Sequence, residues 1–316
     1  MFLSVLGPIS KGLTALRLNA GLGTLTTNFI RDTSQTLEEL HVYEPNNVVG
    51  DDTQYPNLKT LGLPNINFSW DLLDAPNLSH IELIQAMEMT PGFEAFLKKK
   101  KSCKNSAFIR AIRSMVYTNA YHAHLKQLTN VRLEFKSKVD IEQLDLSPDI
   151  LTLSLNTSDE HNVLLPVTII RGLSNYQHLQ HVYLPDCYSP ECLEALCHVI
   201  PLLPNLETTF ISTKYTDGKA LTDSEMTMIF SCFQMHPSLH GISITLHSMS
   251  RDQLVNIMEP GLISGTNIRT FILTYINDDS SVTLSDACRS YFDVTTDYFF
   301  EMDHSRQLIL DRIIKD

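Results

Sequence analysis

The stretch YPNLKTLGLPNI, residues 55–66, contains a proline followed by leucines at positions 58, 61 and 63. The last two leucines are separated by one residue, which is the spacing of a β-strand that buries one face. Pro56 has a fixed φ angle and no N–H, so it suits the turn before a strand, and it disfavours helix in the residue ahead of it. The stretch therefore predicts a turn followed by a short strand.

The same apolar-x-x-apolar-x-apolar frame occurs ten times in order, and five copies have a proline two residues ahead of the frame. The frames begin at Leu13, Leu37, Leu58, Leu78, Leu128, Ile150, Leu179, Leu206, Leu239 and Ile268. Successive frames start 20 to 33 residues apart, except for one gap of 50. One such strand cannot bury its apolar face alone, whereas parallel stacking at about 4.8 Å makes a continuous core. We therefore expect an α/β solenoid, a single array over residues 1–316 with irregular repeats at about 13–275.

The later repeats have room for helices between the strands. Residues 189–204 begin with a capping serine and a proline at the first helical position, and residues 221–237 and 249–263 have similar apolar spacing. The early repeats are short and predict only a turn or a short helix, such as residues 70–76. We expect a concave face of parallel strands and a convex face of helices, better formed in the second half.

The phrases PNLKTLGL, PNLSHIEL, PNLETTFI and HLQHVYLPDC resemble leucine-rich repeats of the ribonuclease-inhibitor-like type. More narrowly, they resemble the repeats of F-box leucine-rich-repeat proteins, in which a cysteine often follows the strand, as Cys187 does here. The resemblance covers about 260 residues, from Leu13 to Leu273. It implies a horseshoe and a substrate-recognition surface. The F-box, which would bind ubiquitin ligase subunits, is absent ahead of Leu13, so that link implies an F-box upstream of Met1.

Two regions interrupt the repeat. The insertion at about 88–127 is expected to be helical, because residues 108–116 have apolar side chains at helical spacing. It also carries a basic run formed by Lys98, Lys99, Lys100, Lys101 and Lys104. Two interpretations stay open, a solvated loop with an extra helix or a docking or nuclear-import patch. The tail at about 283–316 is expected to be a cap that ends in a helix.

Composition narrows the function classes. A net charge of −12 argues against a general affinity for nucleic acid or anionic membrane, and no window is long and apolar enough for a membrane span. Six cysteines without a tight framework suggest free thiols in the cytoplasm or the nucleus. The chain lacks G-x-S-x-G, phosphate-loop and H-E-x-x-H motifs, so we assign no catalytic residue, metal ligand or cofactor.

The strand residues between the buried positions are candidates for a partner-binding surface, because aromatic residues and arginines anchor protein interfaces. The candidates are Arg17, His41, Tyr43, Glu82, Arg132, Glu134, Tyr183, Phe210 and Ile272. Tyr183 and Phe210 share a column in consecutive repeats, unless Thr209 marks a one-residue slip that turns Phe210 inward. Two functions stay open. One is a protein-binding receptor or adaptor that selects substrates for a ubiquitin ligase, and the other is a GTPase-activating regulator of a small GTPase.

Overall fold

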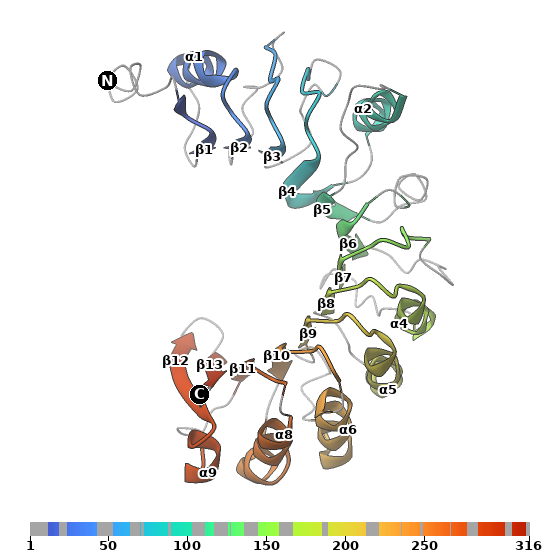
Figure 1. Ribbon diagram of the computed structural model, residues 1–316, viewed down its shortest axis with the longest axis vertical. Helices are drawn as coiled ribbons and strands as arrows, with labels where there is room; N and C mark the ends of the chain where they lie inside the picture. Colours follow the sequence, from blue (N-terminus) through green and yellow to red (C-terminus); the bar gives the residue numbers. More distant parts are fainter. Residues whose placement is uncertain are drawn as a thin grey trace. The chain divides into compact units, whose positions relative to one another are not determined.

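A computed structural model shows an α/β protein with parallel-strand sheets and helices (Figure 1). The described residues are 12–18, 24–42, 53–63, 70, 73–87, 90–102, 111–116, 126, 128–135, 145–157, 167–184, 189–212, 221–234, 236–246, 249–265, 267–276, 284–300 and 305–313. The chain divides into two compact units. Unit 1 comprises Met1–Glu134 and Asp145–Ser147, and unit 2 comprises Phe135–Leu144 and Pro148–Asp316.

The strands of unit 1 lie side by side in chain order and are all parallel. They are β1 (Ala15–Leu18), β2 (Glu39–Val42), β3 (Thr60–Leu63), β4 (His80–Met87), β5 (Ala111–Val116) and β6 (Asn130–Phe135, whose last residue belongs to unit 2). Helix α1 (Thr24–Thr33) joins β1 to β2, and α2 (Pro91–Ser102) lies between β4 and β5. The frame residues Leu58, Leu61, Leu78 and Ile81 are at most 1% exposed, so they form the core.

The sheet of unit 2 has the order β7-β8-β9-β10-β11-β13-β12. The parallel strands are β7 (Thr152–Thr157), β8 (His181–Leu184), β9 (Thr208–Ser212), β10 (Gly241–Leu246) and β11 (Thr270–Ile276). The sheet continues with an antiparallel hairpin, β12 (Phe292–Phe300) and β13 (Ser305–Arg312), in which β13 pairs with β11. The strand β12 is therefore the last strand at one edge of this sheet.

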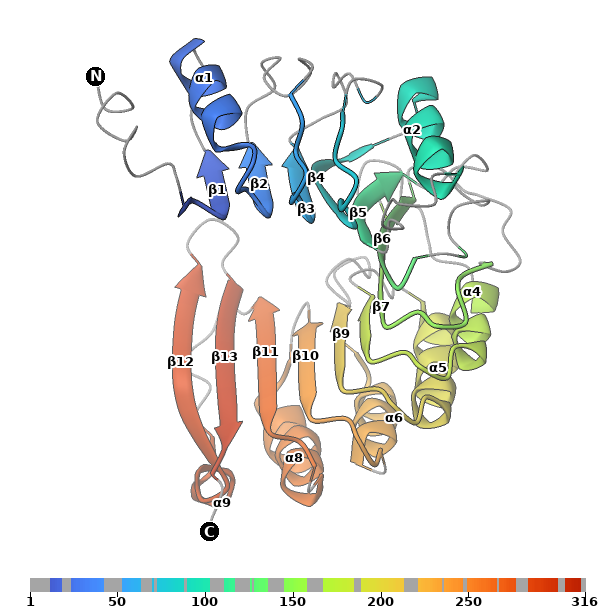
Figure 2. The same ribbon diagram turned by 45° about the horizontal axis from the view of Figure 1, so that its top comes forward.

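The long helices of unit 2 lie on one face of its parallel strands (Figure 2). They are α4 (Val167–Gly172) with η5 (Leu173–Asn175), α5 (Pro190–Val199) with η6 (Ile200–Leu202), α6 (Asp223–Gln234), and the continuous series α7 (Arg251–Gln253), η7 (Leu254–Met258) and α8 (Glu259–Ser264). The short α9 (Asp286–Arg289) precedes β12. Ser189 caps α5 as expected, because its hydroxyl accepts the N–H of Cys192. The face of the sheet opposite these helices is called the open face below.

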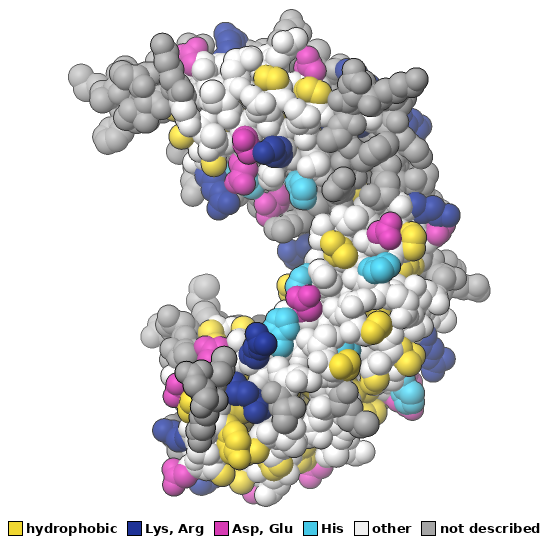
Figure 3. Space-filling model, viewed as in Figure 1, with side chains coloured by type: hydrophobic (Ala, Val, Ile, Leu, Met, Phe, Trp, Pro, Cys, Tyr) yellow, Lys and Arg dark blue, Asp and Glu magenta, His cyan; other side chains and the backbone are white. Residues whose placement is uncertain are grey.

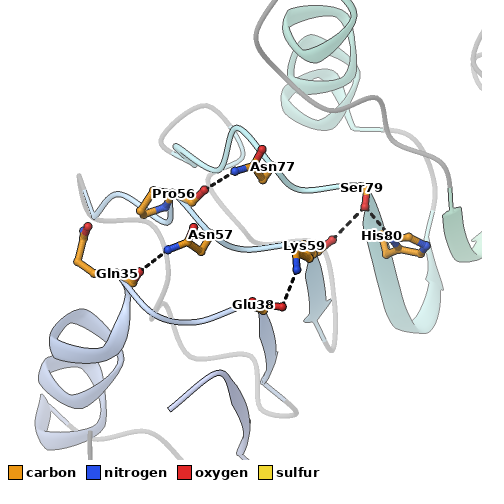
Figure 4. Close-up of polar contacts among 8 residues, drawn as sticks. All are labelled: Gln35, Glu38, Pro56, Asn57, Lys59, Asn77, Ser79 and His80. Carbon is orange, nitrogen blue, oxygen red and sulfur yellow. Dashed lines mark hydrogen bonds and ion pairs between the residues drawn. The ribbon is translucent and has the colours of Figure 1, made fainter. Parts of the chain in front are cut away.

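The asparagine of the PNL phrase ties each turn to the turn before it. Asn57 Nδ2 donates to the Gln35 carbonyl at 2.7 Å, and Asn77 Nδ2 donates to the Pro56 carbonyl at 2.6 Å (Figure 4). In unit 2 Asn205 makes the same bond to Gln177 at 2.8 Å. A turn carbonyl cannot be satisfied within its own short turn, so the next repeat supplies the donor.

The backbone repeats as regularly as the asparagines do. The carbonyl of Glu38 accepts two N–H groups from the next repeat, those of Lys59 and Thr60, at 2.8 and 3.0 Å. Gln180 does the same for Glu207 and Thr208. The carbonyls of Thr14, Lys59, Leu151, Glu207 and His240 are used in the same way. The same hydrogen-bond pattern in both units indicates that each repeat stacks on its predecessor through identical geometry.

Two polar side chains close turns in unit 2. His236 is buried, and its Nε2 donates to the Leu203 carbonyl at 2.9 Å while its Nδ1 accepts the N–H of Leu239 at 3.0 Å, so the ring is neutral. Arg312 donates to three carbonyls at the end of α8 and the turn after it, namely Leu262, Gly265 and Ile268, at 2.6 to 2.8 Å. It therefore fastens the hairpin to the last repeat.

All ten predicted frames contain a strand, while two expectations about the other segments are wrong. The helix predicted over 108–116 is wrong, because Ala111–Val116 forms β5 and pairs with β4 and β6. The prediction of a helix at the end of the tail is also wrong, because Ser305–Arg312 forms β13, which buries Leu308 and Leu310 on one face. The first repeat holds the helix α1 of 10 residues, within the expectation of a turn or a short helix. The basic half of the insertion is helical as expected.

Candidate functional site

One row of side chains runs across the open face of unit 2. It is called the central row, and its members are paired in register from strand to strand: Ser154, Tyr183, Phe210, Ser243, Ile272 and Ile309. Each of these residues lies between two residues that face the helices and are buried, such as Val182 and Leu184 around Tyr183. The alternation of a strand therefore places the whole row on the side without helices.

Tyr183 and Phe210 lie next to each other in this row. They are register partners on β8 and β9, and neighbouring strands are about 4.8 Å apart. Tyr183 is 39% exposed and Phe210 is half-buried, whereas Thr209 is 2% exposed and faces the core. The register slip considered from the sequence is therefore absent, and Phe210 faces outward.

In the half of the central row beyond Phe210, a small side chain lies between large ones. Ser243 pairs with Phe210 on one side and with Ile272 on the other, so one short side chain separates two large ones. Ile272 is half-buried, and Ile309 of β13 continues the apolar surface beyond it. The sequence did not reveal Ile309, because its segment had been interpreted as a helix.

Polar rows flank the central row. On the side of the strand starts, His181 Nδ1 and Thr208 Oγ1 are 2.8 Å apart, and the Thr270 hydroxyl donates to Asp311 at 2.8 Å. Gly241 belongs to this row, and a Cβ there would come within 2.9 Å of Thr208 Cγ2. On the other side the members are Ser212, Thr245, Thr274 and Gln307. The open face of unit 2 is thus an apolar strip between hydroxyl-rich borders.

The corresponding row of unit 1 is charged. Arg17, His41, Gly62 and Glu82 are register partners on β1 to β4. The His41 ring lies over Gly62, since a Cβ on that glycine would clash with His41 Nδ1. His41 Nδ1 is 3.7 Å from the Glu82 carboxylate, an ion pair when the ring is protonated. Gly62 is therefore the gap that lets the imidazole reach Glu82.

The remaining predicted residues are placed as follows. Arg132 is exposed on β6, while Glu134 is on the same strand and its side chain is not among those described. Tyr43 and Lys104 lie outside the described residues. His41 is 4% exposed, which contradicts the exposed position predicted for it. The other described candidates are divided between the two units, with Tyr183, Phe210 and Ile272 together in unit 2.

The basic run of α2 includes one buried residue. Lys98 and Lys99 are exposed, and Lys98 pairs with Glu94 at 2.6 Å. Lys100 is 5% exposed, and its Nζ donates to the carbonyls of Ala75 and Pro76 at 2.7 and 2.8 Å. The prediction that Lys100 belongs to a surface patch is therefore wrong, because the Lys100 ammonium donates to the carbonyls of a turn. The side chain of Lys101 is not described.

The described cysteines of unit 2 are buried thiols. Cys192, Cys197, Cys232 and Cys288 form no disulfide. A hydrogen bond with Cys197, together with burial, raises the pKa of Cys232. Burial and the nearby Glu259 raise the pKa of Cys288 to about 12. A thiol that stays protonated is a poor nucleophile and a poor metal ligand. Within the described residues no three histidine, cysteine or acidic side chains are grouped as metal ligands.

Comparison with known proteins adds no assignment, since neither a family model nor a curated protein sequence matches the chain. Among the helices in the described part of the chain, none is long and apolar enough to cross a membrane.

Proposed function

We propose that this chain is a non-enzymatic protein-binding module of the leucine-rich-repeat type, whose strands line a concave surface that holds a protein partner. The observation that carries the proposal is the central row of unit 2, an apolar strip with polar borders. The repeated backbone hydrogen bonds support a stacked array. The resemblance to F-box leucine-rich-repeat receptors supports a role as a substrate receptor or adaptor of a ubiquitin ligase.

The chemistry of the row suits a protein partner. Tyr183 and Phe210 together offer a larger apolar surface than one side chain, and such aromatic anchors carry a disproportionate share of binding energy. Ser243 leaves room for an apolar side chain of the partner beside them. The hydroxyl groups of Thr208 and Thr270 border the strip, and a polar rim of this kind gives an interface its orientation.

Quantitative affinity purification with variants of the tagged chain tests the proposal. Tyr183→Ala and Phe210→Ala should each reduce capture of the same partner at least tenfold, since both remove an anchor from one surface. Leu202→Ala is the matched control, because Leu202 is 56% exposed on the helical side. If all three variants capture the same proteins as the natural chain, the open face of unit 2 is not the binding surface. Ubiquitin ligase subunits in the captured set would support the receptor role.

A further inference from the structure

We propose that β12 is an open sheet edge that accepts an additional strand from a protein partner, and that the added strand alternates basic and apolar residues. This site is the edge of the sheet and not the central row, so it does not depend on the proposed function above. Three observations carry it: the direction of the backbone groups of β12, an incomplete core row and an unbalanced pair of carboxylates.

The outer backbone groups of β12 are available for pairing. In the part of the chain that the structure describes, β13 is the one strand paired with β12. The N–H of Ile313 donates to the carbonyl of Tyr291 at 2.8 Å, so the peptide groups of Tyr291 face β13. Successive residues of a strand alternate in direction, so those of Asp293 also face β13, while those of Phe292 and Val294 point away from the sheet. The N–H and C=O groups of Phe292 and Val294 can therefore pair with a further strand.

The buried face of the sheet ends incompletely at this edge. One row on the helix side passes through Thr209, Ile242, Phe271, Leu310 and Val294 in register. The first four residues are at most 2% exposed, whereas Val294 is 41% exposed. Hydrophobic side chains also reach the surface over the part of unit 2 that carries α8 and α9 (Figure 3). A further strand with an apolar residue opposite Val294 would complete this row.

The opposite face of the edge is acidic. Asp293 is the register partner of Asp311, and like charges directly opposite each other destabilise a strand pair. The Thr270 hydroxyl donates to Asp311, while Asp293 is exposed at the end of the row. A basic side chain on the added strand would lie beside Asp293 and offset this repulsion. Because residues 293 and 294 face opposite sides, the partner's basic and apolar residues must be adjacent in its sequence.

A basic partner fits this edge better than a second copy of the chain does. Pairing with another β12 would bring the carboxylate of a second Asp293 to the same edge of a chain with net charge −12. The strand sequence FDVTTDYFF also lacks the lysines and prolines that commonly protect an exposed edge from pairing. A bulge between Val294 and Thr296 bends the strand, so the regular part of the edge lies before it.

A labelled nine-residue peptide of alternating lysine and valine is a suitable probe, with a glutamate–valine peptide as its charge-reversed control. We expect the lysine peptide to bind at least tenfold more tightly in fluorescence anisotropy, and to slow hydrogen exchange of the β12 amides. Val294→Pro removes an outward N–H and leaves the bonds to β13 intact, so it should abolish this binding while Val294→Thr retains it. Asp293→Asn should reduce the difference in affinity between the two peptides, whereas Asp286→Asn on α9 should leave that difference unchanged.

Several outcomes would overturn the proposal. Equal binding of the two peptides would show that the edge does not select basic partners. Full binding by Val294→Pro, with the melting temperature unchanged, would place the peptide elsewhere. Slow exchange of the Val294 amide in the free monomer would show that another part of the chain already covers the edge. A dimer that Val294→Pro converts to a monomer would identify a second copy as the occupant. Should Val294→Pro fail to fold, the comparison of Asp293→Asn with Asp286→Asn decides the question.

Discussion

Thr209→Val should stabilise unit 2, although it removes a polar group from the protein. Thr209 stands in a frame position that is apolar in the neighbouring repeats, with Val182 and Ile242 as its register partners. The side chain is 2% exposed, and in the described structure its Oγ1 has no hydrogen-bond partner. Valine has nearly the same shape, so the substitution removes the unsatisfied hydroxyl without opening a cavity.

The magnitude follows from the cost of burying a hydroxyl without a partner, which is about 1–3 kcal/mol in protein mutational data. We therefore expect Thr209→Val to raise the free energy of unfolding by about 1–2 kcal/mol. For domains of 150–250 residues, each kcal/mol shifts the melting temperature by about 2–4 °C. The reciprocal control is Val182→Thr, one strand away in the same row, where valine is 1% exposed. Introducing a hydroxyl there should lower the free energy of unfolding by a similar amount.

Urea unfolding followed by circular dichroism measures both variants, with the midpoints compared at a common slope. The reasoning requires changes of opposite sign for the two substitutions. A loss of stability in Thr209→Val would refute it, because the hydroxyl would then have to make a hydrogen bond that stabilises the fold. Unchanged stability in Val182→Thr would show that a hydroxyl in this row finds a partner by local adjustment.

Three further variants test the buried polar contacts. Lys100→Ala should lower the free energy of unfolding by about 1–3 kcal/mol, because it leaves two turn carbonyls without a donor. In the same urea titration, the control Lys99→Ala should change the free energy of unfolding by less than about 0.5 kcal/mol. Arg312→Lys should speed amide exchange in β12 and β13, since a lysine cannot reproduce three directed bonds to the end of α8; unchanged exchange would mean that the hairpin is held by its strand pairing alone. Burial lowers the pKa of His236 below the unfolded value of about 6.5, so its contribution to stability is present above that pH and is lost as the pH falls below it. Melting curves between pH 7 and pH 5 should show this loss, and His236→Gln should reduce it.

The strands could be predicted because their frames record a physical requirement. Each strand needs a turn before it and alternating apolar side chains after it, and the sequence shows both at Pro56, Leu61 and Leu63. The strand β5 lacks this record: Ser114 stands where the frame requires an apolar residue, and Ile112, Met115 and Val116 also satisfy helical spacing. Its pairing with β4 and β6 decides its structure, and pairing over long sequence distances is not visible in local spacing.

The site was predictable to the extent that strand alternation determines direction. Tyr183 and Phe210 follow from the frame, and the burial of Thr209 removes the alternative register. Ile309 and the open edge at Val294 could not be found, because they depend on β13 folding back beside β11. Lys100 was misplaced because a run of lysines looks uniformly solvated. One position in the run faces the turn at Ala75, and only the orientation of α2 determines which position that is.

The asparagines of the turns have a consequence for synthesis on the ribosome. Asn57, Asn77 and Asn205 each donate to a carbonyl that lies 21 to 28 residues earlier in the chain. The acceptor has therefore always been made before its donor, and each turn can be fastened as soon as its own asparagine leaves the exit tunnel. Each of these turn carbonyls therefore waits only for the next asparagine turn, 21 to 28 residues later in the chain. The carbonyl of Arg269 waits longer, because its donor is the N–H of Arg312 in β13, 43 residues later in the chain.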